Sequence, residues 1–261
     1  MRCLIILLAL LLPLSSSADS SLPFMKDIAG DTELPRPWGI GIDFYTMDQD
    51  YDLESLMFQI PGFPDVEVGD PSQIAVNNEV MHFDIQADVW LLPFLNVFAI
   101  VGKVDIDTLV DFSQAEITGL PFDLGTLPVS FDGTVYGGGF TLAYGNERWF
   151  TSATTTYTKT STSGDLDSSV ESLSVQPRIG LLRNDWRFWV GGMYLDTTEE
   201  HSGLFELPFL GAVPFAVKLA TQDNWNYTAG AGYAFSDRAN LSFEVGFGNR
   251  THTLFNFNVR F

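Results

Sequence analysis

The clearest pattern of apolar and polar positions lies at the end of the chain, between Ala239 and Phe261. Two consecutive runs there have an apolar residue at every second position and mainly polar residues or glycine between. The apolar positions are Leu241, Phe243, Val245, Phe247, Phe255, Phe257, Val259 and Phe261. A period of two residues describes a β-strand with one apolar and one polar face. Because Asn249 to His252 supplies turn chemistry between the runs, we expect a closing β-hairpin.

The closing run is long enough to cross a bilayer, because a tilted transmembrane β-strand needs about ten residues. Its terminal phenylalanine, preceded by apolar residues at alternate positions, resembles the last strand of bacterial outer-membrane β-barrel proteins. The residues that carry this resemblance are Phe255, Phe257, Val259 and Phe261. The resemblance implies that the barrel assembly machinery reads these residues and that the chain lies in the outer membrane of a Gram-negative bacterium. It indicates the class of small outer-membrane protein A-like or porin-like barrels rather than one family within that class.

The amino terminus has the pattern of a secretory signal peptide. A short charged start, Met1 to Cys3, is followed by an apolar run over residues 4–14 and by small residues up to Ala18. This run is too short to span a bilayer as a helix, so we expect cleavage after Ala18 rather than a membrane anchor. Cys3 is the only cysteine in the sequence and would leave with the signal. The mature chain would then have no disulfide and no cysteine nucleophile or cysteine metal ligand.

Between the two ends, the alternation predicts strands separated by short and long connections in turn. We expect a periplasmic lead-in at residues 19–36 and a barrel at residues 37–261. Within the barrel, strands are expected at residues 38–45, 80–92, 95–107, 135–144, 149–162, 170–182, 186–198 and 225–235 and in the closing hairpin. Short turns occur at Pro93, Asn146, Asn184 and Asp237. Outer-membrane barrels place short turns at the periplasm and long loops outside.

The sequence therefore predicts an all-β fold, a single transmembrane antiparallel up-and-down β-barrel of about ten strands (eight to twelve), with both termini in the periplasm. Three longer connections, residues 47–78, 108–132 and 199–224, are expected to be outer loops. Strand-like runs inside them, such as Val213 to Ala220, leave the strand count open by two. Several loop residues are apolar, namely Leu120, Phe122, Leu127, Phe205, Phe209, Leu210 and Phe215. They either pack together as a lid or strand extension, or they form the mouth of a site for an apolar ligand.

The strand at residues 80–92 shows the two faces expected of the wall. Its apolar positions, Met81, Phe83, Ile85, Ala87 and Val89, are expected to face lipid, and the polar residues between them the lumen. The same alternation predicts a set of lumen-facing polar residues: Asp43, His82, Asp84, Asp88, Gln176, Arg178, Glu244, Asn256, Asn258 and Arg260. Since acids and arginines occur together and such a barrel leaves little free space, we expect a packed, mutually neutralised interior.

Aromatic residues support the same orientation. Four tryptophans fall at strand ends on the side of the short turns, where an aromatic belt is expected: Trp38, Trp90, Trp149 and Trp186. Aromatic residues make up 14% of the chain, and the hydrophobic fraction is 46% with only 18% charged residues. This combination favours a membrane barrel over a soluble enzyme.

The formal net charge of −20 argues against a nucleic-acid partner. Many of the acids fall in the expected outer loops, in clusters such as Asp48, Asp50, Asp52 and Glu54. The simplest interpretation is that they keep the loops solvated. Alternatively, magnesium or calcium ions could bridge them to anionic lipopolysaccharide, since both ions prefer oxygen ligands. The expected partners are therefore outer-membrane lipid, lipopolysaccharide and the assembly machinery, and the sequence identifies no extracellular ligand.

Residues with catalytic chemistry are few. The three histidines are His82 among the lumen carboxylates, His201 beside Glu199 and Glu200, and His252 in the last outer turn. Omptin-type proteases use acidic residues with histidine at the outer rim, and lipid A deacylases use serine and histidine. The motifs of those families are missing here, as are a G-x-S-x-G elbow and an H-E-x-x-H helix. We therefore expect no catalytic site, no metal and no cofactor.

Three classes of function fit these observations. The first, which the sequence favours, is a structural or surface-interaction barrel with acidic outer loops and a packed polar lumen. The second is a narrow pore or a conduit for hydrophobic ligands, and the third is a hydrolase at the outer rim, omptin-like or lipid A deacylase-like.

Overall fold

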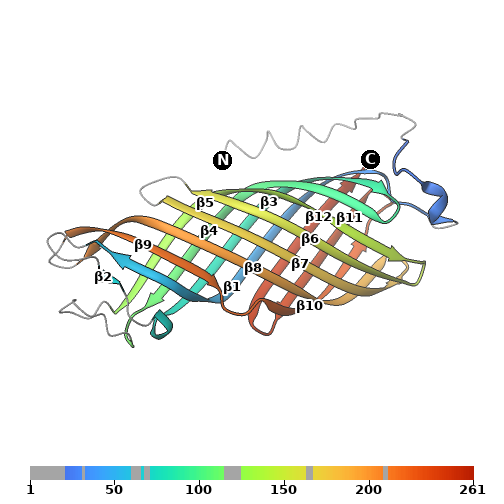
Figure 1. Cartoon of the computed structure of the whole chain (residues 1–261). Helices are drawn as coiled ribbons and strands as arrows, with labels where there is room; N and C mark the ends of the chain where they lie inside the picture. Colours follow the sequence, from blue (N-terminus) through green and yellow to red (C-terminus); the bar gives the residue numbers. More distant parts are fainter. Residues whose placement is uncertain are drawn as a thin grey trace, which may run out of the picture.

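The computed structural model describes residues 21–30, 33–59, 66–67, 71–114, 125–162, 167–207 and 211–261. The predicted signal peptide lies outside these residues, as do the apolar loop residues Leu120, Phe122, Phe209 and Leu210. Most described residues belong to β-strands, which form one elongated barrel with strongly tilted strands (Figure 1). The predicted all-β barrel is confirmed.

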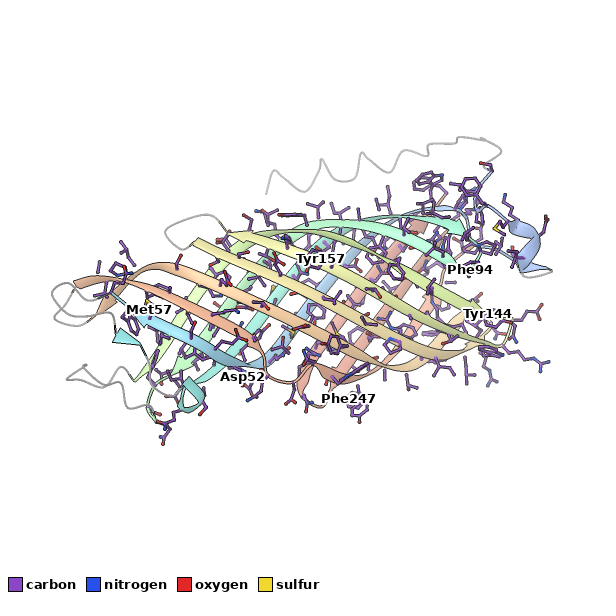
Figure 2. The ribbon with its side chains drawn as sticks, in the orientation of Figure 1. Asp52, Met57, Phe94, Tyr144, Tyr157 and Phe247 are labelled. Atoms are coloured by element: carbon purple, nitrogen blue, oxygen red, sulfur yellow. The ribbon has the colours of Figure 1, made fainter. Side chains whose placement is uncertain are left out.

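The strands follow the alternation along the chain, and neighbouring strands pair antiparallel. Their bounds are β1 Trp38–Phe58, β2 Val66–Glu67, β3 Ala75–Leu92, β4 Leu95–Asp111, β5 Thr126–Gly145, β6 Trp149–Thr162, β7 Asp167–Arg183, β8 Trp186–Leu207, β9 Gly211–Thr221, β10 Trp225–Ala234, β11 Ala239–Phe247 and β12 Arg250–Arg260. The tight turns after β3, β5 and β7 lie at one end of the barrel, which we call the periplasmic end. In Figure 2 the labelled Phe94 and Tyr144 mark this end, and Met57 lies toward the opposite, outer end.

Near the periplasmic end the wall is a closed ring of ten strands: β1, β3, β4, β5, β6, β7, β8, β10, β11 and β12. The last strand pairs with the first in antiparallel register from Gly39↔Arg260 to Gln49↔Arg250. The hydroxyls of Thr46 and Thr253 lie 2.6 Å apart across this seam. Closure leaves no free strand edge within the membrane. This pairing closes the up-and-down barrel that the sequence predicts.

Toward the outer end the ring narrows from ten strands to eight. The β11–β12 hairpin turns back part of the way along the barrel, at Gly248 and Asn249, and β9 lies beyond it (Figure 1). There β9 pairs with β8 on one side and with β1 on the other. The outer ring therefore consists of β1, β3, β4, β5, β6, β7, β8 and β9.

The side chains of β1 show that the wall changes character along its length. Near the periplasmic end, large apolar side chains such as Ile40 and Phe44 point outward and are exposed. Beyond Thr46 the pattern reverses. The outward residues become carboxylates, Asp48, Asp50, Asp52 and Glu54, while the inward residues Met47, Gln49, Tyr51 and Leu53 are buried. The labelled Asp52 and Met57 both belong to this second part of β1 (Figure 2).

The same reversal occurs on the other long strands. The outward residue changes from apolar to charged between Met81 and Glu79 on β3, between Val101 and Lys103 on β4, and between Tyr194 and Asp196 on β8. We call the part between the periplasmic turns and these positions the membrane half, and the part beyond them the outer half. A bilayer requires an apolar outer surface, so the membrane half is the segment that spans it.

Aromatic side chains ring both borders of the membrane half. Exposed at the periplasmic border are Trp38, Tyr144, Trp149, Trp186 and Phe235, and at the outer border Tyr136, Tyr157, Trp225, Tyr227 and Phe247. Figure 2 labels Tyr144 at the first border and Tyr157 and Phe247 at the second. Two such girdles are typical of transmembrane β-barrels, where aromatic rings lie at the headgroup level.

The outer half has the apolar core that a water-soluble β-barrel would have. Buried side chains from β1, β3 and β9 and from the residues that flank β3 and β4 pack together inside it; they are Tyr51, Leu53, Leu56, Phe58, Ile74, Val76, Phe112, Val213 and Leu219. Leu127 and Phe215 pack against this cluster. The positions of Leu127 and Phe215 agree with the first interpretation of the apolar loop residues, in which they pack together as a strand extension.

Strands extend into all three of the expected outer loops. β1 continues to Phe58 and β3 begins at Ala75. β4 continues to Asp111 and β5 begins at Thr126, and β8 and β9 occupy most of residues 199–221. These segments keep the period of two, but the polarity of their faces is reversed. The strands are longer than expected because an acidic outward face was taken as a sign of irregular structure.

The lead-in contains one 3-10 turn, Lys26–Ala29, and is fastened to the periplasmic end of the barrel. The Arg36 guanidinium donates to the Asp237 carboxylate at 2.8 Å and holds the pKa of that carboxyl below its usual value. Among the described residues, no helix has the length and apolar character needed to cross a membrane.

Candidate functional site: the interior of the barrel

A chamber of about 460 Å³ lies in the lumen of the membrane half and extends into the outer half as far as Thr197 and Glu199. Small-molecule sites typically occupy about 300–1,000 Å³. One wall carries the acids and amides of β1, β3 and β12, and the opposite wall carries the serine and threonine hydroxyls of β6 and β7. The chamber is therefore large enough for a small molecule and can offer it many hydrogen-bond partners.

One side of the chamber is held together by a buried ion pair. Arg178 of β7 donates to both carboxylate oxygens of Glu244 on β11, at 2.6 and 2.9 Å. The Trp189 indole also donates to Glu244, at 2.5 Å, and Arg178 also donates to Gln176, at 2.6 Å. A two-pronged arginine–carboxylate pair fixes both side chains in one geometry. This network ties β7, β8 and β11 together across the lumen.

The other side carries carboxylates without a cationic partner of this kind. Asp43 and Asp84 face each other across β1 and β3, and Asp43 accepts a hydrogen bond from Asn256 at 2.7 Å. His82 Nε2 lies 2.9 Å from Asp84 Oδ1, yet neither atom has hydrogen-bond geometry toward a protein partner. The Tyr45 hydroxyl is also buried without a protein partner. These groups require water or a ligand from the chamber.

The periplasmic floor of the chamber is a tight polar cluster around Asp88. This carboxylate accepts hydrogen bonds from Asn96 at 2.6 Å, from Asn258 at 3.2 Å and from Arg260. Gly39 lies directly against it, and a side chain there would come within 2.2 Å of an Asp88 oxygen. The cluster links β3, β4 and β12 at the periplasmic end of the chamber.

Arg250 closes the gap where ten strands become eight. Its side chain is buried and donates to Gln49 Oε1 at 2.7 Å and to the backbone oxygen of Asn224 at 2.7 Å. Asn226 in turn donates to the Arg250 backbone oxygen at 2.8 Å. The Asn224 oxygen also accepts a hydrogen bond from the Leu195 backbone N–H at 2.8 Å, so these contacts connect β8, the β9–β10 connection and the start of β12. Arg250 therefore joins the two rings.

A second polar cluster lies inside the outer half, surrounded by the apolar core. His201 of β8 contacts Ser168 of β7 through Nδ1 at 2.7 Å and Glu199 through Nε2 at 3.0 Å. Asn78 of β3 donates to both Glu199 oxygens, at 3.2 and 3.3 Å. All four residues are buried. A serine, a histidine and a glutamate linked in this order are the components of nucleophilic catalysis.

The residues predicted to face the lumen all lie on inward positions of their strands. Asp43, His82, Asp84, Gln176, Arg178, Glu244 and Asn256 line the chamber, and Asp88, Asn258 and Arg260 form its floor. The interior is not fully packed, because the chamber remains between the two networks. On the opposite face of β12, Phe255 and Phe257 point outward and are exposed, as is the terminal Phe261. Val259 lies on the same face.

Two predicted placements are corrected. Trp90 does not join the exposed belt: its ring lies 5.8 Å from the Arg260 guanidinium, because it shares the inward face of β3 with Asp88. His252 does not lie in the outer turn. It is a buried inward residue of β12, since the turn ends at Asn249 and the strand begins at Arg250.

Ser168 was the residue that the sequence did not reveal. Its partner His201 is far away in the chain, and only the register of β7 on β8 places the two opposite each other. The pair Glu199 and His201 was visible as an i, i+2 spacing on one strand face. For metals, no group of three or more histidine or acidic side chains is arranged to hold an ion within the ranges that the structure covers.

No family model matches the sequence, and no curated protein matches it. Solved structures that match include the outer membrane protease OmpT of Escherichia coli, with a TM-score of 0.46 and 9% identity over 87% of this chain and 97% of that chain. The transport unit of the autotransporter AIDA-I from Escherichia coli matches with a TM-score of 0.40 and 7% identity over 86% and 90%. The toluene transporter TodX of Pseudomonas putida matches with a TM-score of 0.32 and 11% identity over 93% and 92%. These similar structures are bacterial outer-membrane β-barrel proteins, as is this chain by its architecture.

Proposed function

We propose that this protein is a closed, non-conducting outer-membrane barrel whose outer half presents an acidic surface to the cell exterior. The observation that carries the proposal is the reversal of polarity along the strands. A barrel whose outward face turns from apolar to charged while its interior turns apolar is built to stand in water beyond the bilayer.

The charge on this outer surface indicates the class of partner. Outward carboxylates line the outer parts of β1, β3, β4 and β8: Asp48, Asp50, Asp52, Glu54, Glu79, Asp105, Asp107, Asp196 and Glu200. Two of the few lysines nearby, Lys159 and Lys218, are already paired with Glu171 and Glu54. The surface thus favours cationic partners, either basic protein segments or divalent cations that bridge to lipopolysaccharide phosphates.

Side chains at both ends of the chamber support the non-conducting part of the proposal. The Asp88 cluster lies in the lumen at the periplasmic end, and the apolar core of β1, β3 and β9 lies inside the outer half. An ion that crossed the barrel would have to leave water for an apolar core, which costs many kcal/mol. The lumen is thus expected to lack a continuous aqueous path.

Single-channel recording of the purified protein in a planar bilayer tests the closure. We expect no stable unitary conductance at either polarity. Discrete, reproducible conductance steps from the folded protein would contradict the proposal.

Binding of an oligolysine peptide to the protein in nanodiscs of zwitterionic lipid tests the surface role. Binding should weaken with salt and fall when Asp48, Asp50, Asp52 and Glu54 are changed to their amides. The matched control is Asp185→Asn in a periplasmic turn, which should leave binding unchanged. Equal loss in both variants would mean that the outer surface is not the binding face.

A second candidate function is favoured by the chamber of about 460 Å³, whose Tyr45, His82 and Asp84 groups require partners. The barrel would then hold a small polar molecule rather than conduct it. Mass spectrometry of molecules released by denaturing the purified protein tests this, and release of water and detergent alone would argue against it.

A further inference from the structure

Ser168, His201 and Glu199 form a hydrogen-bonded line across two strands of the outer half. Ser168 and His201 are direct antiparallel partners on β7 and β8, and Ser168 Oγ lies 2.7 Å from His201 Nδ1. Glu199 precedes His201 by two positions and so shares its inward face; its Oε2 lies 3.0 Å from His201 Nε2. The strand register thus fixes a nucleophile, a base and an orienting carboxylate in one line.

The hydrogen bonds define which proton each group carries. Both Glu199 oxygens accept from Asn78, so the carboxylate acts as an acceptor on that side. His201 Nε2 therefore donates its proton to Glu199, and Nδ1 presents a lone pair to the Ser168 hydroxyl. A neutral histidine in this tautomer can remove the serine proton while the carboxylate stabilises the resulting positive charge.

A small apolar cavity adjoins the histidine. It measures about 70 Å³, and His201 is one of the few polar residues in a lining that includes Leu127, Val129, Phe131 and Phe215. The Phe131 ring lies 4.9 Å from the imidazole. A short acyl chain fits such a space, whereas a long fatty chain exceeds it.

The described strand pairing of β6 and β7 ends close to this line of residues. The pairing of β5 with β6 ends at Gly133↔Thr162, and the pairing of β7 with β8 ends at Asp167↔Ser202. Within the described part of the chain, residues 126–132 of β5 and 203–207 of β8 rise beyond these pairs and pair on their other edges only, with β4 and β9. Ser168 is thus next to the described end of β7, between the longer strands β5 and β8.

We infer that Ser168, His201 and Glu199 form a hydrolytic triad for esters of short apolar acyl groups. Ser168 Oγ attacks the ester carbonyl carbon as its proton passes to His201 Nδ1. The bond from carbonyl carbon to alcohol oxygen breaks, and the alcohol leaves with that proton. Water then attacks the acyl-serine through the same base, releasing the carboxylic acid and restoring the Ser168 hydroxyl. The reaction needs only ester and water, and it is independent of the proposed acidic surface, which uses the outward face.

A fluorophosphonate probe tests the inference on the folded, full-length protein in detergent micelles. We expect one covalent adduct, placed on Ser168 by peptide mass spectrometry. Hydrolysis of p-nitrophenyl butyrate should fall by about 10²–10⁴-fold in Ser168→Ala and in His201→Gln. The butyrate ester should be cleaved at least ~10-fold faster than the palmitate ester, because the cavity excludes the longer chain.

Ser172→Ala is the matched control, because Ser172 lies on the same inward face of β7 and its hydroxyl bonds to Thr197 of β8 rather than to His201. It should keep both labelling and hydrolysis. A wild-type protein that is folded by circular dichroism but unlabelled at Ser168 would overturn the inference. Labelling at Ser168 that persists unchanged in His201→Gln would also overturn it, since the histidine would then not activate the serine.

Discussion

The membrane half and the outer half are made from the same strands, yet they place polar and apolar side chains on opposite faces. In the membrane half, Ile40 and Phe44 of β1 face lipid while Asp43 lines a polar chamber. In the outer half, Asp50 and Asp52 of the same strand face water while Tyr51 and Leu53 are buried in an apolar core. A period of two therefore identifies a strand, but the medium outside decides which face is turned in.

The difference also shows how each half is stabilised. The outer half relies on apolar burial, as a soluble barrel does. The membrane half gains nothing from placing apolar groups next to lipid, so its interior depends on paired charges such as Arg178 with Glu244. The predictions below test this contrast through the free energy of unfolding in urea, measured for the protein refolded into detergent or lipid vesicles.

The largest expected effect comes from breaking the ion pair of the membrane half. Arg178→Met leaves the buried Glu244 carboxylate without its main partner and should destabilise the protein by about 3–5 kcal/mol. Adding Glu244→Gln should recover much of the loss, because the buried charge is then gone. The contrasting change is Lys218→Met, which breaks an exposed pair with Glu54 in the outer half and should leave stability unchanged. Similar losses in both single variants would remove the distinction between the halves.

Truncating a side chain in the apolar core should cause the next largest loss in the free energy of unfolding. Leu219, buried on β9, packs in the core of the outer half, and Leu219→Ala should cost about 2–5 kcal/mol through lost contacts and a residual cavity. Leu254→Ala is the control in the membrane half. Because Leu254 lines a chamber that already contains free space, its truncation should cost clearly less. A larger loss for Leu254→Ala than for Leu219→Ala would mean that the tightly packed core lies in the membrane half.

A charge on the outward face of β3 should distinguish lipid from water. Ile85→Arg puts a cation on the lipid face of the membrane half and should cost about 2–4 kcal/mol. Glu79→Arg, on the same strand and face but in the outer half, should change stability by less than about 0.5 kcal/mol. Equal penalties would mean that the border between the halves does not lie between residues 79 and 81.

The smallest effect concerns Tyr51 at alkaline pH. Burial, and next the charge of Glu199, raise the pKa of the Tyr51 phenol well above its usual value of 10.0. Since the folded pKa is raised, the contribution of Tyr51 to stability is complete below pH 10.0 and declines as the unfolded phenol ionises above it. Each such proton changes stability by at most about 1.4 kcal/mol per pH unit. Tyr51→Phe should therefore lose stability less steeply than the wild type above that pH, and identical slopes would mean that the phenol is not held neutral.

The sequence predicted the membrane half better than the outer half for a physical reason. Strands such as 80–92 have a continuous apolar face, and their faces and turns follow from alternation and turn chemistry. At residues 48–54 the alternation continues, but with carboxylates on the outward face, which resembles a solvated loop. Pro214 in β9 weakened that strand's signal further.

The interior sites were predicted unevenly. The lumen-facing residues were predicted from the period of two, because the alternation within each strand shows which of its faces is turned inward. Contacts between different strands could not be predicted from the sequence. The contacts of Arg178 with Glu244 and of Ser168 with His201 depend on the order and register of the strands around the ring. The change from a ring of ten strands to a ring of eight could not be predicted either, since it depends on the pairing of β9 with both β8 and β1.

That bridge has a consequence for how the barrel could part. The seam between the first and last strands ends at Gln49↔Arg250, and from Tyr51 onward the same edge of β1 is held by β9. β8 is held in the same way, first by β10 and then by β9. The seam between β1 and β12 is therefore closed at its outer end, where Arg250 lies. The β1–β12 seam can therefore separate only from the periplasmic end. The β11–β12 hairpin can then be inserted or withdrawn while the outer ring of eight strands stays intact.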